Sequence, residues 1–487
     1  MKVLFVSSEV SPFAKVGGLA DVAGSLPKEL RRQGHDIRIV MPFYGMIEQD
    51  RRSGKRWGIE PLADSMPVAM NGHWLEHATV MQADFESVPV YFIGHERFFR
   101  GATSSDKIYT PGIDQYLFFS AAVLELVHVL GWTPDVVQCN DWQTGFVSVL
   151  MREKLESRFG RTGAVFTIHN LAYQGEFGVE ILDALALPRT LFVPELLETW
   201  GAVNFLKAGC VYSDQVNTVS PRYAREIQTA EYGCKLEGLM KHLAAEEKLS
   251  GILNGIDTGF FDPANDPYLP AHYTSGNLAG KRECRKALLA ETGMKPIPGA
   301  PVMGAVTRLS SQKGLDLLAR TAPRLFELPI QLVIQGLGDP AIVTQMRLLQ
   351  EEFPNHIRFI DRFDEDLAQR IYAGSDLFAM PSVFEPCGLG QMIAMRYGTI
   401  PVVRNTGGLA DTVREGENGF VFEEKSEVAL CAAVERAAKA YRKPQTWRRI
   451  VRRAMDADNS WSRSAHEYVD LYERALAARR DSMLKLA

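Results

Sequence analysis

The chain has 487 residues, of which 46% are hydrophobic and 23% are charged, and its formal net charge is −5. A chain of this length predicts two or three domains, because one hydrophobic core rarely serves so many residues. The slight negative charge excludes a general attraction to nucleic acid or to anionic membranes, so an anionic ligand has to be held by local cations.

The first half alternates short apolar runs with amphipathic stretches. The runs are typical of buried parallel strands, and the stretches between them have helical spacing, the first of them ending where Gly34 can cap it. This alternation predicts an α/β domain with a doubly wound, Rossmann-like parallel sheet. The expected strands are 3–6, 37–41, 88–93, 136–138, 164–168 and 215–219, and the expected helices are 19–33, 114–130 and 142–155.

The loop after the first expected strand reads Lys-Val-Gly-Gly-Leu-Ala-Asp over residues 15–21. Adjacent glycines let a ligand approach the backbone and turn N–H groups outward, and the helix that follows favours an anion at its N-terminus. Lys15 adds a full positive charge. The alternative is a plain strand-to-helix turn, but Lys15 and Asp21 beside the glycines favour a site.

Polar clusters follow further expected strands of the first half. Asp141 lies in Asn-Asp-Trp, His169 ends a strand beside an amide, and Asn254 begins Asn-Gly-Ile-Asp. A similar cluster, Thr-Gly-Gly-Leu-Ala-Asp, occupies 406–411 in the second half. One such cluster would be an ordinary turn with local hydrogen bonds, and a lone histidine is usually structural. Several at strand ends, where α/β proteins bind ligands, predict a binding site.

A second series of strands and helices begins after Gly251 and repeats the first architecture. Its expected strands are 302–306, 330–335, 357–360, 377–380 and 400–403, with a helix at 314–328. We therefore predict an N-terminal α/β domain over 1–250 and a C-terminal α/β domain over 255–455, facing each other across a cleft. The amphipathic stretch 460–480 predicts a helix that packs back on the N-terminal domain.

Two cations lie five residues apart in the loop after strand 302–306. An arginine fork such as that of Arg308 grips a phosphate with two hydrogen bonds, and Lys313 supplies a second charge. A diphosphate leaving group needs such neutralisation. The alternative is a pair of solvated surface cations, but the position at a strand end favours a function.

A carboxylate opens the turn Glu-Pro-Cys-Gly-Leu-Gly at 385–390. Glu385 can accept hydrogen bonds from sugar hydroxyls, and the N–H groups of the turn can hold phosphate oxygens. The alternative is that Glu385 only caps the helix expected at 391–397.

The cysteines and the apolar runs narrow the class of protein. Cys-x-x-Cys pairs are absent, which argues against zinc, and scattered thiols are typical of a reducing cytosol. The N-terminal apolar run is too short for a signal peptide, and no stretch reaches the roughly 18 apolar residues of a membrane helix. We therefore expect a cytoplasmic protein without a zinc site, whose oligomeric state stays open.

These motifs together resemble bacterial glycogen synthases and plant starch synthases, the ADP-glucose-dependent α-1,4-glucan synthases. The resemblance runs from Met1 to about Tyr472 and also includes His-Asn-Leu-Ala-Tyr-Gln-Gly at 169–175 and Phe-Leu-Lys-Ala-Gly at 205–209. It implies a two-domain glycosyltransferase B-type fold, with the acceptor on the N-terminal side and the nucleotide sugar on the C-terminal domain. It also implies ADP-glucose as donor, a glycogen-like α-1,4-glucan as acceptor, anomeric retention, and neither a metal nor another cofactor.

The resemblance also implies roles for individual residues. Lys15, Gly17, Gly18, Arg308 and Lys313 would hold the diphosphate, and Asp21 would lie near the nucleotide. Glu385 would bind a glucose hydroxyl, with Cys387, Gly388 and Leu389 close by, and Phe363 would pack on adenine where relatives often have tyrosine. Asp141, His169 and Asn254 would line the sugar pocket. The implied catalytic set is Asp141, His169, Asn254, Arg308, Lys313 and Glu385.

Three departures from the family pattern concern the site. Gln143 stands where many relatives have histidine, and Gly390 replaces a common threonine, so a phosphate-binding hydroxyl is missing. The segment 98–109 matches the usual aromatic acceptor loop poorly, which affects the expected acceptor contacts more than the donor contacts.

Two alternatives remain. A retaining transferase of the same fold that uses a UDP-sugar or sucrose is the first, but many such enzymes carry two glutamates separated by seven residues, and here Ile393 takes the second position. The other is a glucan- or nucleotide-binding regulator without turnover, against which the retained charged set argues.

Overall fold

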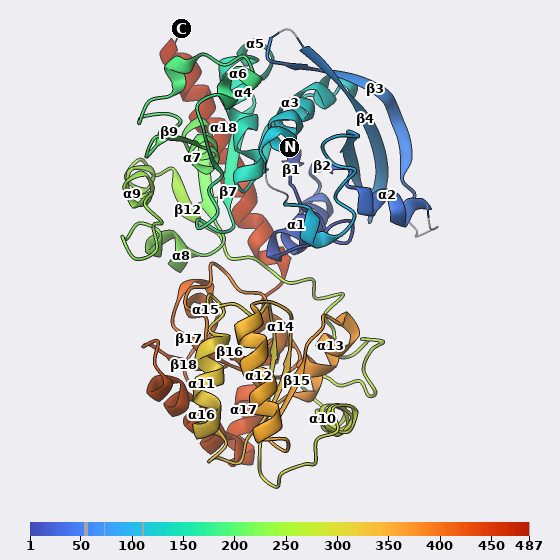
Figure 1. Cartoon of the computed structure of the whole chain (residues 1–487), viewed down its shortest axis with the longest axis vertical. Coiled ribbons are helices and arrows are strands. Elements are labelled where there is room, and N and C mark those ends of the chain that lie inside the picture. Colours follow the sequence, from blue (N-terminus) through green and yellow to red (C-terminus); the bar gives the residue numbers. More distant parts are fainter. Residues whose placement is uncertain (53–56, 73, 110–111, 487) are drawn as a thin grey trace. The chain divides into compact units, whose positions relative to one another are not determined.

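The structure is a computed structural model that describes residues 1–52, 57–72, 74–109 and 112–486. The chain forms two compact α/β units (Figure 1). Unit 1 comprises the described residues of Met1–Val219, Ala224–Gly255 and Trp461–Ala487, and unit 2 comprises Ser220–Tyr223 and Ile256–Ser460. The predicted α/β class is confirmed for both units, whereas the cleft between them stays a prediction.

Unit 1 is built on a nine-stranded sheet with the order β12-β11-β7-β6-β1-β2-β5-β4-β3. From β12 to β5 all neighbours are parallel, as the apolar runs predict. The strands are β1 (Lys2–Val6), β2 (Asp36–Pro42), β3 (Glu60–Met70), β4 (Trp74–Phe85), β5 (Val88–Gly94), β6 (Val136–Asn140), β7 (Gly163–Ile168), β11 (Gln215–Thr218) and β12 (Leu249–Gly251).

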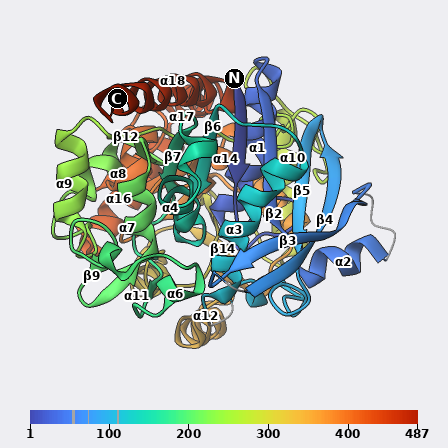
Figure 2. The same ribbon diagram turned by 90° about the horizontal axis from the view of Figure 1, so that it is seen from above.

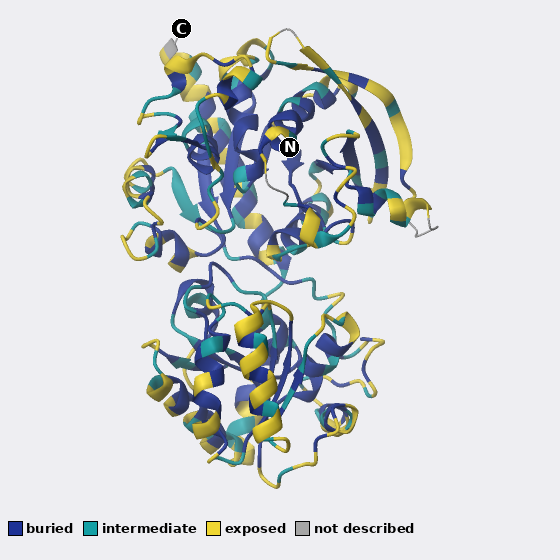
Figure 3. Ribbon diagram, viewed as in Figure 1, coloured by how far each residue is buried: buried dark blue, intermediate teal, exposed yellow. Residues whose placement is uncertain are grey.

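The sheet continues beyond β5 into two antiparallel strands that the sequence analysis does not predict. β4 pairs antiparallel with β5 and with β3, and the β3–β4 pairing has register shifts. The outer strand β3 is largely exposed, whereas the central strands are buried (Figure 3). The doubly wound sheet therefore carries an antiparallel extension at one edge.

Helices cover both faces of this sheet (Figure 2). One face carries α1 (Gly18–Arg32) and α18 (Trp461–Leu486), and the other carries α3 (Asp114–Val129), α4 (Gly145–Glu153) and α7 (Phe205–Tyr212). As expected, α1 is followed by Gly34 in the left-handed region, with φ +92°. The shorter helices are α2 (Gly45–Arg52), α5 (Glu156–Phe159), α6 (Ile181–Ala184), α8 (Pro221–Glu226) and α9 (Glu237–Ala245), with 3-10 turns at Ser105–Lys107, Trp142–Thr144 and Arg189–Leu191.

The final helix, α18, belongs to unit 1 although its sequence follows unit 2. Two of its tyrosines lie buried against the sheet: Tyr472 donates to Gln138 Oε1, and Asn217 Nδ2 donates to Tyr468 Oη at 3.3 Å. Arg479 donates to the carbonyl of Gly160 at 2.6 Å. A small antiparallel sheet with the order β8-β10-β9 completes the unit, formed by β8 (Glu176–Phe177), β9 (Glu198–Thr199) and β10 (Ala202–Asn204).

Unit 2 contains a six-stranded, fully parallel sheet with the order β15-β14-β13-β16-β17-β18. The strands are β13 (Val302–Val306), β14 (Gln331–Gln335), β15 (Ile357–Ile360), β16 (Leu377–Met380), β17 (Ile400–Arg404) and β18 (Phe420–Phe422). The helices are α10 (Ala279–Glu291), α11 (Leu315–Leu325), α12 (Pro340–Glu352), α13 (Glu365–Gly374), α14 (Gly390–Arg396), α15 (Gly407–Thr412), α16 (Glu427–Tyr441) and α17 (Pro444–Met455).

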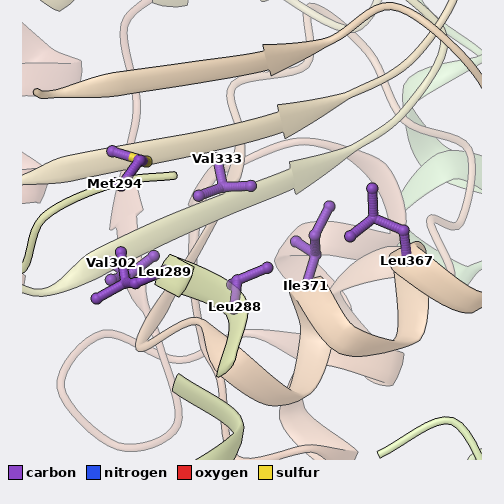
Figure 4. Close-up of a cluster of buried hydrophobic side chains, with 7 residues drawn as sticks. All are labelled: Leu288, Leu289, Met294, Val302, Val333, Leu367 and Ile371. Atoms are coloured by element: carbon purple, nitrogen blue, oxygen red, sulfur yellow. The ribbon is translucent and has the colours of Figure 1, made fainter. Parts of the chain in front are cut away.

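A buried apolar cluster packs the neighbouring strands β13 and β14 of this sheet against α10 and α13 (Figure 4). Val302 of β13 and Val333 of β14 belong to one cluster with side chains from both helices, and every member is at most 4% exposed. Burying such a side chain contributes roughly 1.5–3 kcal/mol, so the strand ends that leave this cluster start from fixed positions. Its members are Leu288, Leu289, Met294, Val302, Val333, Leu367 and Ile371.

Candidate functional site

An ion pair spans the switch point of the unit 2 sheet. The strand order places β14 on one side of β13 and β16 on the other, so ligands are expected outside the ends of β13 and β16. Lys313, in the loop after β13, donates to both carboxylate oxygens of Glu385, after β16, at 2.9 and 2.7 Å. The structure thus brings together two of the predicted residues that lie 72 positions apart.

Glu385 is a buried partner of Lys313 and not a helix cap. Its side chain is 6% exposed, against 20% for Lys313, and Ser382 Oγ donates to its Oε2 at 3.0 Å. The helix α14 begins at Gly390 and receives no hydrogen bond from a capping side chain. The alternative that Glu385 caps this helix is therefore excluded, as is the alternative that Lys313 is a solvated surface cation.

Two glycines allow the loops of this pair to approach each other. Gly314 lies in the left-handed region with φ +70°, and a Cβ there would meet the carbonyl oxygen of Pro381 at 2.0 Å. Gly408 donates to the carbonyl of Glu385 at 3.1 Å, and a Cβ on it would meet the Cys387 oxygen at 2.2 Å. The Thr-Gly-Gly cluster therefore supports the Glu385 turn from behind.

Arg308 lies beside this pair in sequence but is arranged differently. Arg308 is exposed, and within the described part of the chain its guanidinium makes no hydrogen bond or ion pair, although its carbonyl accepts from Thr307 Oγ1 at 3.4 Å. An unpaired guanidinium at the end of β13 is available to an anion with two acceptor oxygens. The predicted diphosphate role of Arg308 and Lys313 stays a prediction.

Two exposed apolar side chains follow the neighbouring strands β14 and β15. Phe363 is 63% exposed and Leu337, in the Gly-Leu-Gly turn, is 51% exposed. The turn is held by Leu309, whose N–H donates to the Leu337 carbonyl at 2.8 Å. Large exposed apolar groups near a strand-end site favour a flat ligand. Phe363 is among the site residues expected from the sequence, whereas Leu337 is not, because its only signal is its place between two glycines.

In unit 1 the switch point lies between β1 and β6, and Asp141 follows β6 directly. Its backbone has φ +57° and ψ 174°, a region that a residue with a side chain adopts only under strain of about 1–3 kcal/mol. Its Oδ1 accepts the His169 N–H at 2.7 Å. Burial raises the pKa of Asp141 to about 7, against the opposing hydrogen bonds from the backbone of His169 and Asn170. Strain and a raised pKa together are typical of functional carboxylates.

The His169 ring is neutral. Burial lowers the pKa of His169 to about 3. Asn140 donates from Nδ2 to the carbonyl of Val6 at 2.9 Å, so its Oδ1 faces His169 Nε2 at 3.0 Å and accepts the proton there. The other ring nitrogen, Nδ1, therefore carries the lone pair and acts as a hydrogen-bond acceptor.

Asn254, which follows β12, has a buried amide with an unused acceptor. The residue is 5% exposed, and its Oδ1 finds no hydrogen-bond partner among the described residues. A buried polar atom without a partner costs about 1–3 kcal/mol. An acceptor of this kind, like His169 Nδ1, suits a ligand that brings hydroxyl groups.

The loop between β1 and α1 differs from its prediction in one respect. The N–H groups of Val16 and Gly17 do not point to a ligand, because both donate to Glu9 Oε2, at 2.6 and 2.9 Å. Lys15 pairs with Asp21 at 2.6 Å, and both side chains are partly exposed. No side chain caps α1, so its N-terminus at Gly18 keeps the dipole that favours an anion.

Gly17 is not required by the fold. Its φ is −146°, which any residue adopts, and a Cβ built there meets no described atom within 4 Å. Open space beside a predicted ligand loop is consistent with close approach of a ligand, and this gives a test.

Gly17→Ala is expected to change the free energy of unfolding by less than about 1 kcal/mol, because the backbone and the space permit a methyl group. It should nevertheless lower kcat/KM for the donor by roughly 10-fold, since overpacking against a ligand costs about 1–3 kcal/mol. Gly238→Ala in α9, where a Cβ is equally unhindered, is the matched control. Equal kcat/KM in both variants would contradict the ligand role of this loop.

The segment 98–109 is anchored at both ends. Phe99 is fully buried, Phe98 stacks on Phe118 with ring centroids 4.9 Å apart, and Tyr109 donates to Glu9. Sequence reasoning missed Glu9 and Tyr109. A glutamate just after a strand of apolar residues is the only signal that the sequence offers for the first.

Within the described part of the chain, every helix falls short of the length or the apolar character needed to cross a membrane.

Comparisons with known proteins agree on one family. Residues 2–242 match the family described as "Starch synthase catalytic domain", and residues 295–454 match "Glycosyl transferases group 1". The glycogen synthase of Desulforudis audaxviator (strain MP104C) is 46% identical, covering 98% of this chain and 97% of that protein. The glycogen synthase of Moorella thermoacetica is 44% identical, covering 100% and 99%.

Two solved structures resemble the chain to different degrees. The catalytic domain of starch synthase IV from Arabidopsis thaliana, bound to ADP and acarbose, has a TM-score of 0.90 and 36% identity, covering 98% of this chain and 99% of that chain. A sucrose-phosphate synthase from Thermosynechococcus elongatus has a TM-score of 0.61 and 17% identity, covering 98% and 99%, and supports the fold alone.

Proposed function

The chain belongs to the glycogen and starch synthase family of glycosyltransferases, and on this premise we propose that it moves glucose from ADP-glucose to the non-reducing 4-hydroxyl end of an α-1,4-glucan, with anomeric retention and release of ADP. Its two α/β units have the glycosyltransferase B-type fold. The observation that carries the proposal is the Lys313–Glu385 pair at the switch point of unit 2, with the unpaired Arg308 nearby in the chain.

This pair suits the departure of a diphosphate. Glu385 holds the Lys313 ammonium in place before any ligand binds, and a preorganised cation stabilises developing negative charge without having to reorganise. Arg308 adds an uncompensated charge with a two-pronged fork. Because these cations come from the protein, we propose that the reaction needs no metal.

The acceptor groups of unit 1 suit a sugar. His169 Nδ1 and Asn254 Oδ1 accept hydrogen bonds and have no protein donor among the described residues, and Asp141 adds a carboxylate with a raised pKa. We propose that these groups contact sugar hydroxyls. We assign no protein nucleophile, and the proton of the attacking 4-hydroxyl passes to a phosphate oxygen.

The choice of base in the donor depends on the comparison with a relative more than on the side chains that would contact the base. The exposed faces of Phe363 and Leu337 suit any flat base, because stacking discriminates weakly between bases. ADP and acarbose are bound in the starch synthase IV structure, and this supports ADP-glucose as donor and a glucan as acceptor here. Ile393, buried in α14, lies where UDP-sugar enzymes of this fold often carry a second glutamate, which argues against the alternative donor.

Incubating the protein with glycogen and radiolabelled ADP-glucose or UDP-glucose tests the proposal. We expect label in glycogen from ADP-glucose, with equal rates with and without a chelator. Incorporation from UDP-glucose alone would replace the donor, and incorporation from neither would favour a binding protein without turnover. A rate that vanishes with chelator would contradict the metal-free reaction.

A further inference from the structure

The buried carboxylate of Glu9 lies where three segments of unit 1 meet. Glu9 lies three residues after the end of β1 at Val6 and is 3% exposed. Oε2 accepts the N–H groups of Val16 and Gly17, and Oε1 accepts the hydroxyl of Tyr109. One carboxylate therefore holds both the loop before α1 and the end of segment 98–109.

The rest of the loop is held without this carboxylate. Val10 and Ala14 exchange two backbone hydrogen bonds at 3.1 and 3.0 Å, and Tyr44 donates to the carbonyl of Ser8 at 2.9 Å. Glu9 is therefore not needed to close the turn at 10–14. What it fixes is the part of the loop that leads into Lys15 and the N-terminus of α1.

Burying the Glu9 carboxylate to hold this loop costs free energy. No lysine, arginine or histidine among the described residues forms an ion pair with Glu9, and burying a charge is expensive unless hydrogen bonds compensate it. Hydrogen bonds to an ionised acceptor are about twice as strong as neutral ones, so the charge holds the loop more firmly than a neutral side chain would. The charge of Glu9 also raises the pKa of Asp141, although burial of Asp141 contributes more.

We propose that Glu9 is a positioning residue for glucosyl transfer: it fixes the 15–18 loop and, through Tyr109, ties segment 98–109 to that loop. The inference rests on the proposed function, because it assigns the loop to the donor and the segment to the acceptor. Its consequence is that a change of the shared carboxylate alters the kinetics of both substrates, whereas loss of the Tyr109 hydroxyl alters those of the acceptor alone.

The test compares Glu9→Gln, Tyr109→Phe and the double variant in initial-rate kinetics with ADP-glucose and glycogen. Glu9→Gln should lower kcat/KM for both substrates by roughly 10- to 100-fold, the factor lost with a hydrogen bond to a charged group. Tyr109→Phe keeps both backbone hydrogen bonds, so it should raise the KM for glycogen by about 3- to 10-fold and leave that for ADP-glucose unchanged. The double variant should have the same kinetic constants as Glu9→Gln alone, because both substitutions break the same contact between Tyr109 and Glu9.

Asp214→Asn provides the matched control. Asp214 also accepts a backbone N–H, from Ala164 at 2.7 Å, and it pairs with Arg152 at 2.8 Å, away from the loop. This variant should lower the stability of unit 1 without changing the ratio of the two KM values. Glu9 variants that lose stability but keep wild-type kcat and both KM values would overturn the inference.

A readout without substrate separates this inference from the proposed function. Amide hydrogen exchange of residues 15–18 should speed up by about 10-fold or more in Glu9→Gln, because two N–H groups lose an ionised acceptor. If the wild-type protein transfers no glucose but exchange speeds up, the proposed function fails while the positioning contact stands. Unchanged exchange in Glu9→Gln would refute the positioning role whatever the enzyme transfers.

Discussion

Replacing Lys313 with alanine is expected to lower kcat with ADP-glucose and glycogen by roughly 10²- to 10³-fold, the cost of losing one preorganised group that stabilises charge in the transition state. The variant should also lose about 2–3 kcal/mol of unfolding free energy, because Glu385 stays buried without its partner. Rates of label transfer and urea unfolding measure the two effects separately.

The double variant Lys313→Ala/Glu385→Gln distinguishes chemistry from folding. Neutralising Glu385 should restore most of the stability, since the unpaired charge is gone, but not the activity. Arg308→Ala should lower kcat by about 10²-fold without a loss of stability, because the exposed guanidinium has no described partner. Lys439→Ala, at an exposed position of α16, should change neither quantity. Near-normal kcat in Lys313→Ala and Arg308→Ala together would contradict the leaving-group role.

Replacing Asp141 with asparagine should stabilise the protein at pH 8 and abolish most of its activity. The raised pKa of Asp141, about 7 against 3.8 in an exposed carboxyl, means that ionising it opposes folding by up to about 4 kcal/mol. Asparagine keeps the oxygen that accepts the His169 N–H but carries no charge. Unfolding free energies at pH 8 and label-transfer rates test both halves of this expectation.

The pH dependence of stability gives a sharper form of the same test. The folded pKa of Asp141 is raised, so the contribution of Asp141 to the free energy of unfolding is present at low pH and is lost as the pH rises from about 4 to 7. The folded pKa of His169 is depressed, from 6.5 to about 3. The contribution of His169 to the free energy of unfolding is therefore lost as the pH falls below 6.5. Between about pH 4 and 6.5 the two slopes oppose each other.

The wild-type protein should therefore show little pH dependence from these two groups in that window. In Asp141→Asn only the contribution of His169 should remain, so the free energy of unfolding should rise with pH by up to about 1.4 kcal/mol per pH unit. His169→Gln should leave the aspartate slope, with stability falling as the pH rises. The same pH profile in all three proteins would show that neither group is buried as the structure has it.

The central strands could be predicted because they are buried on both faces and read as continuous apolar runs, as β1 and β13 do. The antiparallel strands β3 and β4 were missed for the opposite reason. Of the eleven residues of β3, only Met66 and Val68 are buried, and Pro61 and Pro67 interrupt the pattern. A strand with one face in solvent leaves a weak signal that a turn-rich segment can imitate.

The site shows a similar division. Residues at strand ends could be predicted to gather, because parallel strands end at one edge of a sheet, and in the structure Asp141 and His169 are in contact there. The pairing of Lys313 with Glu385 has no local pattern, since it depends on which strands become neighbours. The role of Glu9 could not be predicted from the sequence for another reason. Two of its partners are backbone N–H groups, which every residue except proline supplies.

The return of α18 to unit 1 has a consequence for the order in which the chain is made. On the ribosome, residues 256–460 emerge before Trp461–Leu486, so unit 2 has its whole sequence while the Gln138 and Asn217 side chains still lack Tyr472 and Tyr468. Domains generally fold as units during synthesis, with the N-terminal one first. Synthesis of unit 1 therefore starts before that of unit 2 and ends after it.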